Sequence, residues 1–344
     1  MNSKKSFRRE PLSDTQLLMS IAVGIFVVMY LLAIVFLKGG FLHAKQIFDM
    51  LNDNASLIIV SCGLTIVMIS GGIDISVGAV TSLVVMACVL YLNKGGNIFV
   101  AILISLGIGL AFGAIHGFLI SYLDIQPFIV TLAGMFLARG LTTILSVNPQ
   151  KIEHEAFIKL KEFRIEIPWL GYVSPKNGNL IPAKMELGVV VALVCVALVF
   201  LVLMFHKLGR GFYAIGGNQT SALMLGINVK KTRFFAYLMS GLLSGISGFV
   251  FLMHTGAGNS TNALGMEMNA IASSIIGGTL LTGGVGNVFG TFFGTMILIT
   301  IKKIVVSSGL KGAWWQSITT GGMLCFFILL QSVILSIRAK RKKA

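Results

Sequence analysis

Electrical charge, and negative charge above all, is what this chain has least of. Only 12 of its 344 residues are Asp or Glu, 27 are Lys or Arg, and charged residues make up 11% of the total. Soluble domains carry about 25% charged residues on average. With 56% hydrophobic residues, the composition excludes an ordinary soluble enzyme and indicates a membrane protein.

Residues that would bind a metal or a nucleotide are also missing. The four cysteines stand alone in apolar stretches, without the Cys-x-x-Cys spacing of a metal site: Cys62, Cys88, Cys195 and Cys325. No Gly-Lys dipeptide occurs, so the chain has no phosphate-binding Walker A loop. We therefore expect no metal site, no catalytic residues and no bound cofactor. Nucleic acid is not an expected partner either, because the net charge of +15 lies between and beyond apolar runs.

Long apolar runs fill most of the chain. A bilayer core of about 30 Å requires about 20 helical residues. Ten runs come near this length: residues 17–37, 54–70, 77–92, 98–122, 127–147, 185–205, 234–253, 268–281, 285–301 and 316–337. The sequence predicts an all-α polytopic membrane protein with about ten transmembrane helices, in a single domain over residues 1–344.

Many of the forty glycines repeat at intervals of four within these runs. Helices in lipid associate through small residues that let their backbones approach. Three such series predict faces of tight helix packing: Gly109, Gly113 and Gly117; Gly241 and Gly245; and Gly286, Gly290 and Gly294. These glycines are expected to build the scaffold rather than a binding site.

Two glycine pairs interrupt apolar segments in a similar way. Gly71-Gly72 is followed by Gly78, and Gly283-Gly284 is followed by Gly290. Paired glycine interruptions point to broken helices around a transport pathway. We expect broken or re-entrant segments near residues 71–78 and 282–287.

The distribution of cations predicts the orientation in the membrane. Loops rich in Lys and Arg remain in the cytoplasm. Residues 206–233 carry five such cations and no acid, and residues 338–343 carry five more. Residues 148–184 mix both signs and are predicted to be extracytoplasmic. With ten spans, both termini are then cytoplasmic.

Three ionisable side chains are predicted to lie at or near membrane depth, where charge is costly and indicates function. Arg139 lies in the fifth span, and either ties helices together or contacts substrate. Asp74 lies in the first break, where it either serves transport or caps the helix that follows. Glu267 begins the eighth span, where it either serves transport or simply lies at the membrane surface. The chain has no row of carboxylates, which argues against a proton-coupled carrier.

The cytoplasmic segment contains a predicted short helix over residues 220–225. Asn218 or Thr220 is the expected N-cap, and Gly226 is the expected stop. Exposed Leu and Met on a short helix between glycines suit a groove on another protein. A solvated, positively charged loop is the alternative, which explains the charge but not the apolar residues.

Four segments, residues 71–78, 126–133, 209–226 and 270–286, carry a resemblance along nearly the whole chain. In this order they resemble the permease subunits of bacterial carbohydrate ABC importers of the ribose, galactose and xylose type. Residues 53–55, 132–136 and 313–315 look most like the galactofuranose permeases of that family.

This resemblance implies a multi-pass subunit of the bacterial cytoplasmic (inner) membrane. Its implied partners are an ABC ATPase that uses ATP and Mg²⁺, an extracytoplasmic sugar-binding protein, and a second permease, identical or related. It also implies that residues 206–233 dock on the ATPase, through Gly209, Arg210, Gly216, Asn218, Ala222, Leu223 and Gly226.

A neutral sugar requires polar groups that match hydroxyls, and the broken segments and their neighbours supply several. The candidates for the translocation pathway are Asp74, Ser76, Gln126, Asn262, Asn269 and Thr279. The alternative function is an ion-coupled secondary sugar transporter, in which Asp74 or Glu267 binds the coupling ion.

Overall fold

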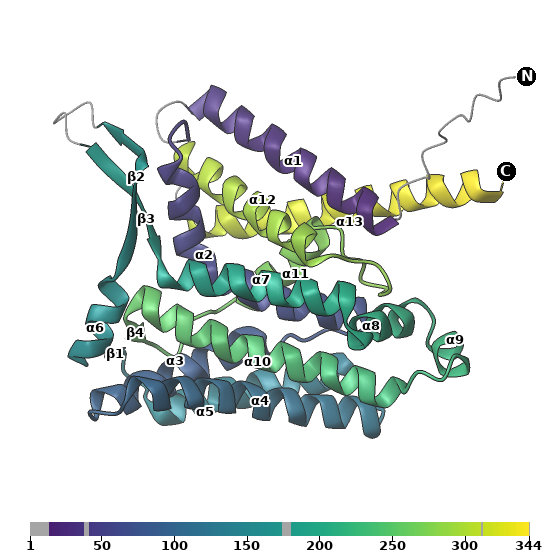
Figure 1. Cartoon of the computed structure of the whole chain (residues 1–344), viewed down its shortest axis with the longest axis horizontal. Coiled ribbons are helices and arrows are strands. Elements are labelled where there is room, and N and C mark those ends of the chain that lie inside the picture. Colours follow the sequence, from purple (N-terminus) through teal and green to yellow (C-terminus); the bar gives the residue numbers. More distant parts are fainter. Residues whose placement is uncertain (1–13, 38–40, 174–179, 311, 344) are drawn as a thin grey trace, which may run out of the picture.

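The computed structural model describes residues 14–37, 41–173, 180–310 and 312–343, and it is mostly helical (Figure 1). The helices are α1 (Asp14–Leu37), α2 (Lys45–Ile69), α3 (Val77–Asn93), α4 (Ile98–Tyr122), α5 (Pro127–Leu145), α6 (Glu155–Glu162), α7 (Leu187–Phe205), α8 (Lys207–Gly217), α9 (Gln219–Met224), α10 (Val229–Thr255), α11 (Met266–Ile276), α12 (Val288–Ser307) and α13 (Ala313–Lys343). The strands are β1 (Gln150–Lys151), β2 (Arg164–Val173), β3 (Leu180–Glu186) and β4 (Ala257–Gly258).

The prediction of an all-α polytopic membrane protein is confirmed. Within the described ranges, eight helices are long and apolar enough to cross a membrane: α1, α2, α4, α5, α7, α10, α12 and α13. Figure 1 shows α8 and α9 at one end of the molecule, together with the start of α1 and the end of α13. The hairpin of β2 and β3 lies at the opposite end.

Two of the ten expected spans are not full-length helices. Helix α3 has 17 residues, and α11 has 11. At 1.5 Å per residue, α11 is only about 16 Å long and is too short to cross the membrane alone. The expected span 268–281 is therefore wrong as a continuous helix. It ends at Ile276 because Gly278 adopts a left-handed conformation (φ +94°), and residues 277–287 continue as irregular backbone.

Each short helix borders one of the two breaks. Residues 71–76 join α2 to α3, and residues 277–287 join α11 to α12. Eight of the ten expected spans thus correspond to helices long and apolar enough to cross a membrane, and the other two correspond to α3 and α11. The sequence thus located both breaks, while the second proved longer than the predicted 282–287.

Helix α2 forms the centre of the bundle, and 18 of its residues are buried. Hydroxyl groups link it to its neighbours: Thr65 Oγ1 lies 3.0 Å from Ser274 Oγ and 2.7 Å from Thr291 Oγ1. Ser56 Oγ lies 2.6 Å from Ser247 Oγ of α10. Such interhelical hydrogen bonds replace the hydrophobic drive that lipid cannot supply.

Helices α4 and α10 pack through the predicted glycines. A Cβ atom on Gly109 would overlap the carbonyl oxygen of Gly241 and lie 2.9 Å from the Gly245 backbone. A Cβ on Gly113 would lie 2.7 Å from the carbonyl oxygen of Tyr237. The backbones touch directly, as the spacing of four residues predicted. In the third series, Gly290 and Gly294 of α12 pack in the same way against Ser273 of α11 and Gly277 just after it, whereas Gly286 lies before α12 begins.

The segment predicted to be extracytoplasmic contains structure that the sequence did not predict. Strands β2 and β3 form an antiparallel hairpin in which Arg164 pairs with Glu186, with an irregularity between Ile167 and Tyr172. Strand β1 pairs with β4, so this segment is also tied to the end of α10.

Candidate functional site

Helices α8 and α9 form a compact unit at one end of the bundle, which we call the coupling segment (residues 207–226). Asn218 caps α9, because its side-chain oxygen accepts a hydrogen bond of 2.8 Å from the backbone N–H of Ser221. Gly226 ends the turn in a left-handed conformation with φ +79°. The short helix, one of its two proposed N-caps and its stop thus lie close to where the sequence placed them.

The coupling segment exposes an apolar surface. Leu223, Met224 and Leu225 are 63%, 81% and 79% exposed, whereas Ala222 is buried against Ile215 and Val229. Ala222 therefore anchors α9 to its own chain, and the three larger side chains face outwards. Arg210 is exposed on α8. A Cβ atom on Gly209 would overlap the α7 backbone at Val202 and Leu203, so α8 folds back tightly on α7.

Gly216 brings the coupling segment into direct backbone contact with both breaks. A Cβ atom on Gly216 would overlap the carbonyl oxygen of Ile69 and lie 2.6 Å from the backbone nitrogen of Gly284. A Cβ on Gly283 would lie 2.9 Å from the Cα of Gly71 and 3.0 Å from that of Gly216. We call these four residues, Gly71, Gly216, Gly283 and Gly284, the glycine junction.

Two hydrogen bonds hold the glycine junction together. The Gly284 N–H donates to the carbonyl oxygen of Ile69 at 2.8 Å, which joins one break to the other. The Tyr213 hydroxyl of α8 donates to the carbonyl oxygen of Gly286 at 2.7 Å. Burial raises the pKa of Tyr213 to about 12, so this hydroxyl keeps its proton. The sequence singles out these glycines but does not predict that they lie in contact, because they come from three distant segments.

Asp74 lies buried in the first break, in a polar cluster with Ser76, Ser240 and His116. Its Oδ1 accepts hydrogen bonds from the Ser76 backbone N–H at 3.0 Å and from the Ser76 hydroxyl at 2.6 Å. Its Oδ2 accepts one from Ser240 of α10 at 2.9 Å, and the Ser76 hydroxyl also lies 3.4 Å from His116 Nδ1. Asp74 therefore fixes the start of α3 and ties it to α10.

Arg139 has the tying role that was one of its two interpretations. Its guanidinium donates to three backbone carbonyls of the segment that precedes α11, those of Ser260 (3.1 Å), Asn262 (2.7 Å) and Ala263 (3.1 Å). Three carbonyl dipoles thus satisfy a cation at a depth where an unpaired charge is costly.

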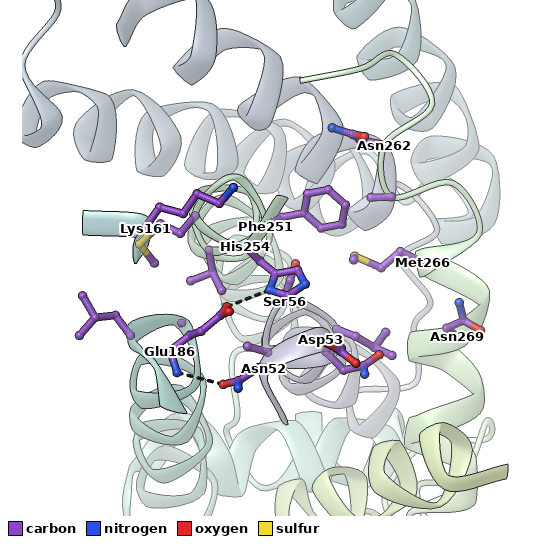
Figure 2. Close-up of a pocket in the computed structure, with 18 of the residues that line it drawn as sticks. Asn52, Asp53, Ser56, Lys161, Glu186, Phe251, His254, Asn262, Met266 and Asn269 are labelled. Carbon is purple, nitrogen blue, oxygen red and sulfur yellow. Dashed lines mark hydrogen bonds and ion pairs between the residues drawn. The ribbon is translucent and has the colours of Figure 1, made fainter. Parts of the chain in front are cut away.

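The predicted pathway residues do not form one group. Asn262 and Asn269 line a cavity of about 420 Å³ at the hairpin end of the bundle (Figure 2). Thr279 is buried in the second break, and its hydroxyl has no hydrogen-bond partner among the described residues. Gln126 is exposed in the turn between α4 and α5. The structure therefore does not bring Gln126 together with the other candidates.

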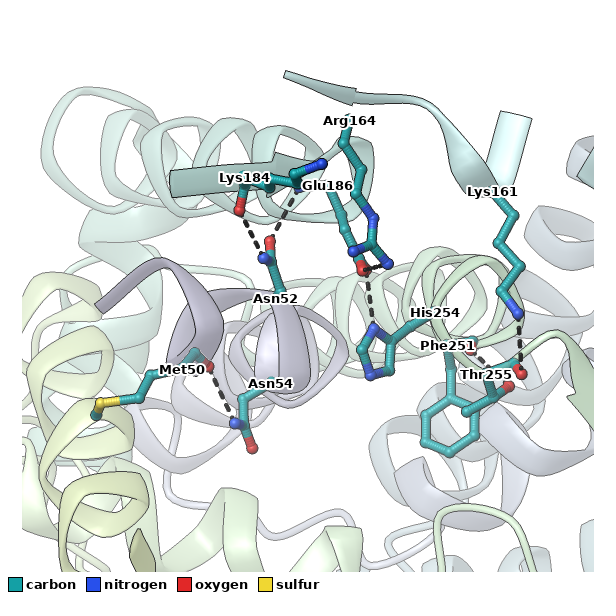
Figure 3. A network of polar contacts seen from close by, with 10 residues as sticks. All are labelled: Met50, Asn52, Asn54, Lys161, Arg164, Lys184, Glu186, Phe251, His254 and Thr255. Atoms are coloured by element: carbon teal, nitrogen blue, oxygen red, sulfur yellow. Dashed lines mark hydrogen bonds and ion pairs between the residues drawn. The ribbon is translucent and has the colours of Figure 1, made fainter. Parts of the chain in front are cut away.

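A polar network that the sequence did not indicate borders this cavity (Figure 3). Glu186, at the end of β3, pairs with Arg164 at 2.9 Å and with His254 of α10 at 2.8 Å. The Asn52 amide donates to the carbonyl oxygen of Lys184 and accepts from the Glu186 N–H, at 2.8 and 2.9 Å. These residues come from distant parts of the chain, so no local sequence pattern could have grouped them.

The described residues contain no cluster of His, Cys, Asp or Glu that could hold a metal ion. Three of the four cysteines are buried, and Cys325 is exposed. Glu267 is 8% exposed, and its Oε2 has no hydrogen-bond partner in the described part of the chain.

Comparison with known proteins finds the same kind of protein each time, a permease of a transport system. A family model described as "Branched-chain amino acid transport system / permease component" matches residues 46–328. The inner membrane ABC transporter permease protein YjfF of Escherichia coli is 39% identical over 315 residues, 90% of either chain. The fructose import permease protein FruG of Bifidobacterium longum is 32% identical over 98% of this chain and 96% of its own.

A third relative is the ribose import permease protein RbsC of Escherichia coli, 31% identical over 86% of this chain and 88% of its own. No solved structure matches the chain.

Proposed function

Because the chain belongs to the family of branched-chain amino acid transport system permease components, we propose that it is the membrane-spanning subunit of an ATP-driven importer for a monosaccharide. It is a transport subunit and not an enzyme, as its relatives are named permeases of import systems. The sugar is suggested by the relatives named for fructose and ribose import.

The contact between the coupling segment and the two breaks is the observation that best supports this proposal. A partner that pushes α9 would move α8, and α8 touches both breaks through the glycine junction. Close-packed backbone leaves no soft side chain to absorb the displacement. A movement at the surface would therefore change the backbone within the membrane.

The proposed partner at this surface is an ABC ATPase that binds ATP and Mg²⁺. The exposed Leu223, Met224 and Leu225 would fill a groove on that ATPase, as the apolar anchors of a helix do in helix-in-groove recognition. ATP binding would close the ATPase domains, move the coupling segment, and expose the pathway to the other side. No cofactor would bind to the permease itself.

The remaining partners follow from the same proposal. A second permease, identical or related, would complete the pathway, and an extracytoplasmic binding protein would deliver the sugar. The coupling segment would then lie in the cytoplasm, with both termini on that side of the bacterial inner membrane. The hairpin of β2 and β3 would face the binding protein.

We further propose that the sugar is galactofuranose, galactose or a ribose-like monosaccharide. This rests on the resemblance of residues 53–55, 132–136 and 313–315 to the galactofuranose permeases. Competition among galactofuranose, ribose and fructose for uptake would test it, and strongest inhibition by fructose would contradict it.

An ion-coupled secondary carrier is the alternative. The buried Glu267, whose Oε2 has no partner among the described residues, is the observation that favours it, because such a carboxylate can take up an ion or a proton. This alternative predicts uptake without ATP and inhibition by ionophores.

Loss of coupling provides the test. Deletion of residues 221–225, or Arg210→Glu, should abolish ATP-dependent sugar uptake while the chain remains folded and inserted. Lys94→Glu is the matched control, because it reverses an exposed charge at the other end of the molecule and should leave uptake unchanged. Normal uptake by the deletion variant would refute the assignment of the coupling segment.

A further inference from the structure

The cavity at the hairpin end of the bundle is large enough for a small molecule. Its volume of about 420 Å³ lies within the range of about 300–1,000 Å³ that is typical of ligand sites. It is lined by the start of α2, the end of α10, the start of α11 and the end of α12, with Glu186 and Leu187 on one side. Figure 2 shows these side chains around a common space.

The charges that line the cavity balance. Asp53 and Glu186 supply two negative charges, and Lys161 and Lys302 supply two positive ones. Glu186 is already held by Arg164 and His254, and Asp53 pairs with Lys303 at 3.3 Å. Lys161 and Lys302 donate to the Thr255 carbonyl oxygen and to Asn269 Oδ1. Each of these four charged side chains thus already has a partner in the protein, so a neutral polar ligand can bind without separating an ion pair.

The cavity also offers hydrogen-bonding groups that remain unused. Asn269 accepts a hydrogen bond from Lys302 at 2.7 Å through Oδ1, which leaves its amide N–H groups without a protein acceptor among the described residues. Asn262 uses its amide nitrogen on the carbonyl oxygen of Ala257, which leaves its Oδ1 without a described donor. The Thr261 hydroxyl has no described partner either.

Donors, acceptors and a hydroxyl therefore line the same cavity, together with the Phe251 side chain. A sugar carries hydroxyls that both donate and accept, together with an apolar C–H face. It can hydrogen-bond with each of these groups without bringing a charge into the site, whereas an apolar ligand would cover them without offering a partner.

We propose that this cavity is a receiving site for a neutral sugar within the permease chain itself. The site rests on the proposed function, since it would accept the sugar on the side where the binding protein delivers it. Arg139 positions the segment beside it, because its guanidinium holds the backbone carbonyls of residues 260, 262 and 263, of which residues 262 and 263 line the cavity.

Protection of a cysteine placed in the cavity tests the proposal on the full chain. Thr261→Cys is introduced together with Cys325→Ser, which removes the exposed native thiol. Labelling by a membrane-impermeant thiol reagent is timed with no addition, with D-galactose or D-ribose, and with D-gluconate as an anion of similar size. We expect a severalfold slower reaction with a neutral sugar and no change with gluconate.

Two further variants control this experiment. Leu264→Cys, a second position on the cavity wall with an exposed side chain, should show the same protection. Asn148→Cys, exposed at the same end of the molecule but outside the cavity, should react at one rate throughout. Equal rates with and without sugar at both cavity positions, or equal protection by gluconate, would overturn the proposal.

The outcome is independent of the proposed function, because labelling requires neither ATP nor a partner. ATP-driven uptake without protection would refute the receiving site alone. Protection together with uptake that ignores ATP would support the site and refute the ATP-driven importer.

Discussion

The two ends of the molecule are held together by different kinds of contact. At the end that carries α9, contact is made by bare backbone: Gly216 touches Ile69 and Gly284, and no side chain separates them. At the hairpin end, contact is made by long polar side chains, such as Glu186 with Arg164 and His254, around a cavity of about 420 Å³.

This difference corresponds to two tasks. Backbone packed on backbone transmits a displacement, because neither surface can yield without moving the chain. Polar side chains around a cavity can exchange partners with water or a ligand, and so suit recognition. Substitutions that fill space should therefore be most harmful at the glycine junction, whereas substitutions that remove a polar group should matter most between the junction and the hairpin.

The largest effect is expected for Gly284→Ala. Gly284 has φ +74°, and a Cβ atom there would lie 2.7 Å from the Cα of Gly217. A left-handed alanine costs about 1–2 kcal/mol, and overpacking adds about 1–3 kcal/mol. A cost of this size is a large fraction of the stability of a typical protein. We therefore expect the thermal unfolding temperature in detergent to drop and uptake in proteoliposomes to be largely lost.

Gly95→Ala is the matched control for this prediction. Gly95 has φ +82°, but nothing lies within 4 Å of its Cβ position. An alanine at position 95 has the same backbone strain but collides with no neighbouring atom, so uptake should fall much less. Equal losses in the two variants would show that strain alone matters and that the close approach at the junction does not.

A smaller effect is expected for Asp74→Asn, between the two ends. The neutral amide has one accepting oxygen, whereas the carboxylate accepts from Ser76 and Ser240 through both. Loss of a hydrogen bond to a charged group costs about 1.5–3 kcal/mol, so the thermal unfolding temperature in detergent should drop. Asp124→Asn, an exposed position, should leave it unchanged, and an equal drop would contradict the role of Asp74.

The hairpin end is tested by Arg139→Gln. The glutamine amide has only two N–H groups, so at least one of the three carbonyls that Arg139 holds loses its donor. The edge of the cavity should therefore loosen. We expect the KM of uptake to rise severalfold with a smaller change in kcat. Arg139→Lys should restore part of the affinity, because it keeps one charged donor. An unchanged KM in the Gln variant would refute this positioning role.

The smallest effect is expected for Tyr213→Phe, which removes one hydrogen bond to Gly286 and about 1 kcal/mol of stability. Burial raises the pKa of Tyr213 to about 12, so the stability it contributes is fully present below the unfolded pKa of about 10. It is lost progressively as the pH rises above the unfolded pKa and through the folded pKa. The stability difference between wild type and variant should thus stay constant between about pH 6 and about pH 9, and a change within that window would contradict the assignment.

Features that depend on neighbouring residues could be predicted from the sequence. Asn218 and Gly226 mark the limits of a short helix by their own side chain and backbone preferences, and the glycines of α4 and α10 mark a packing face by their spacing. The glycine pairs at 71–72 and 283–284 likewise located both breaks.

Features that depend on contacts between distant segments could not be predicted from the sequence. Gly71, Gly216 and Gly284 meet only because three parts of the chain fold together, and nothing near any one of them indicates the other two. The hydropathy of residues 268–281 suggested a complete span, since an apolar run does not reveal that Gly278 will end the helix. Gln126 was placed with the pathway on residue type alone, and the fold puts it in an exposed turn.

The most direct test of the account is the number of ATP molecules hydrolysed per sugar imported by the reconstituted transporter. It should be measured with Gly216→Ala and with Gly217→Ala, because a Cβ on Gly216 would overlap the carbonyl oxygen of Ile69, whereas nothing lies within 4 Å of that on Gly217. The account predicts continued hydrolysis with little import for Gly216→Ala, and wild-type coupling for Gly217→Ala. Wild-type coupling in both variants would contradict transmission through the glycine junction.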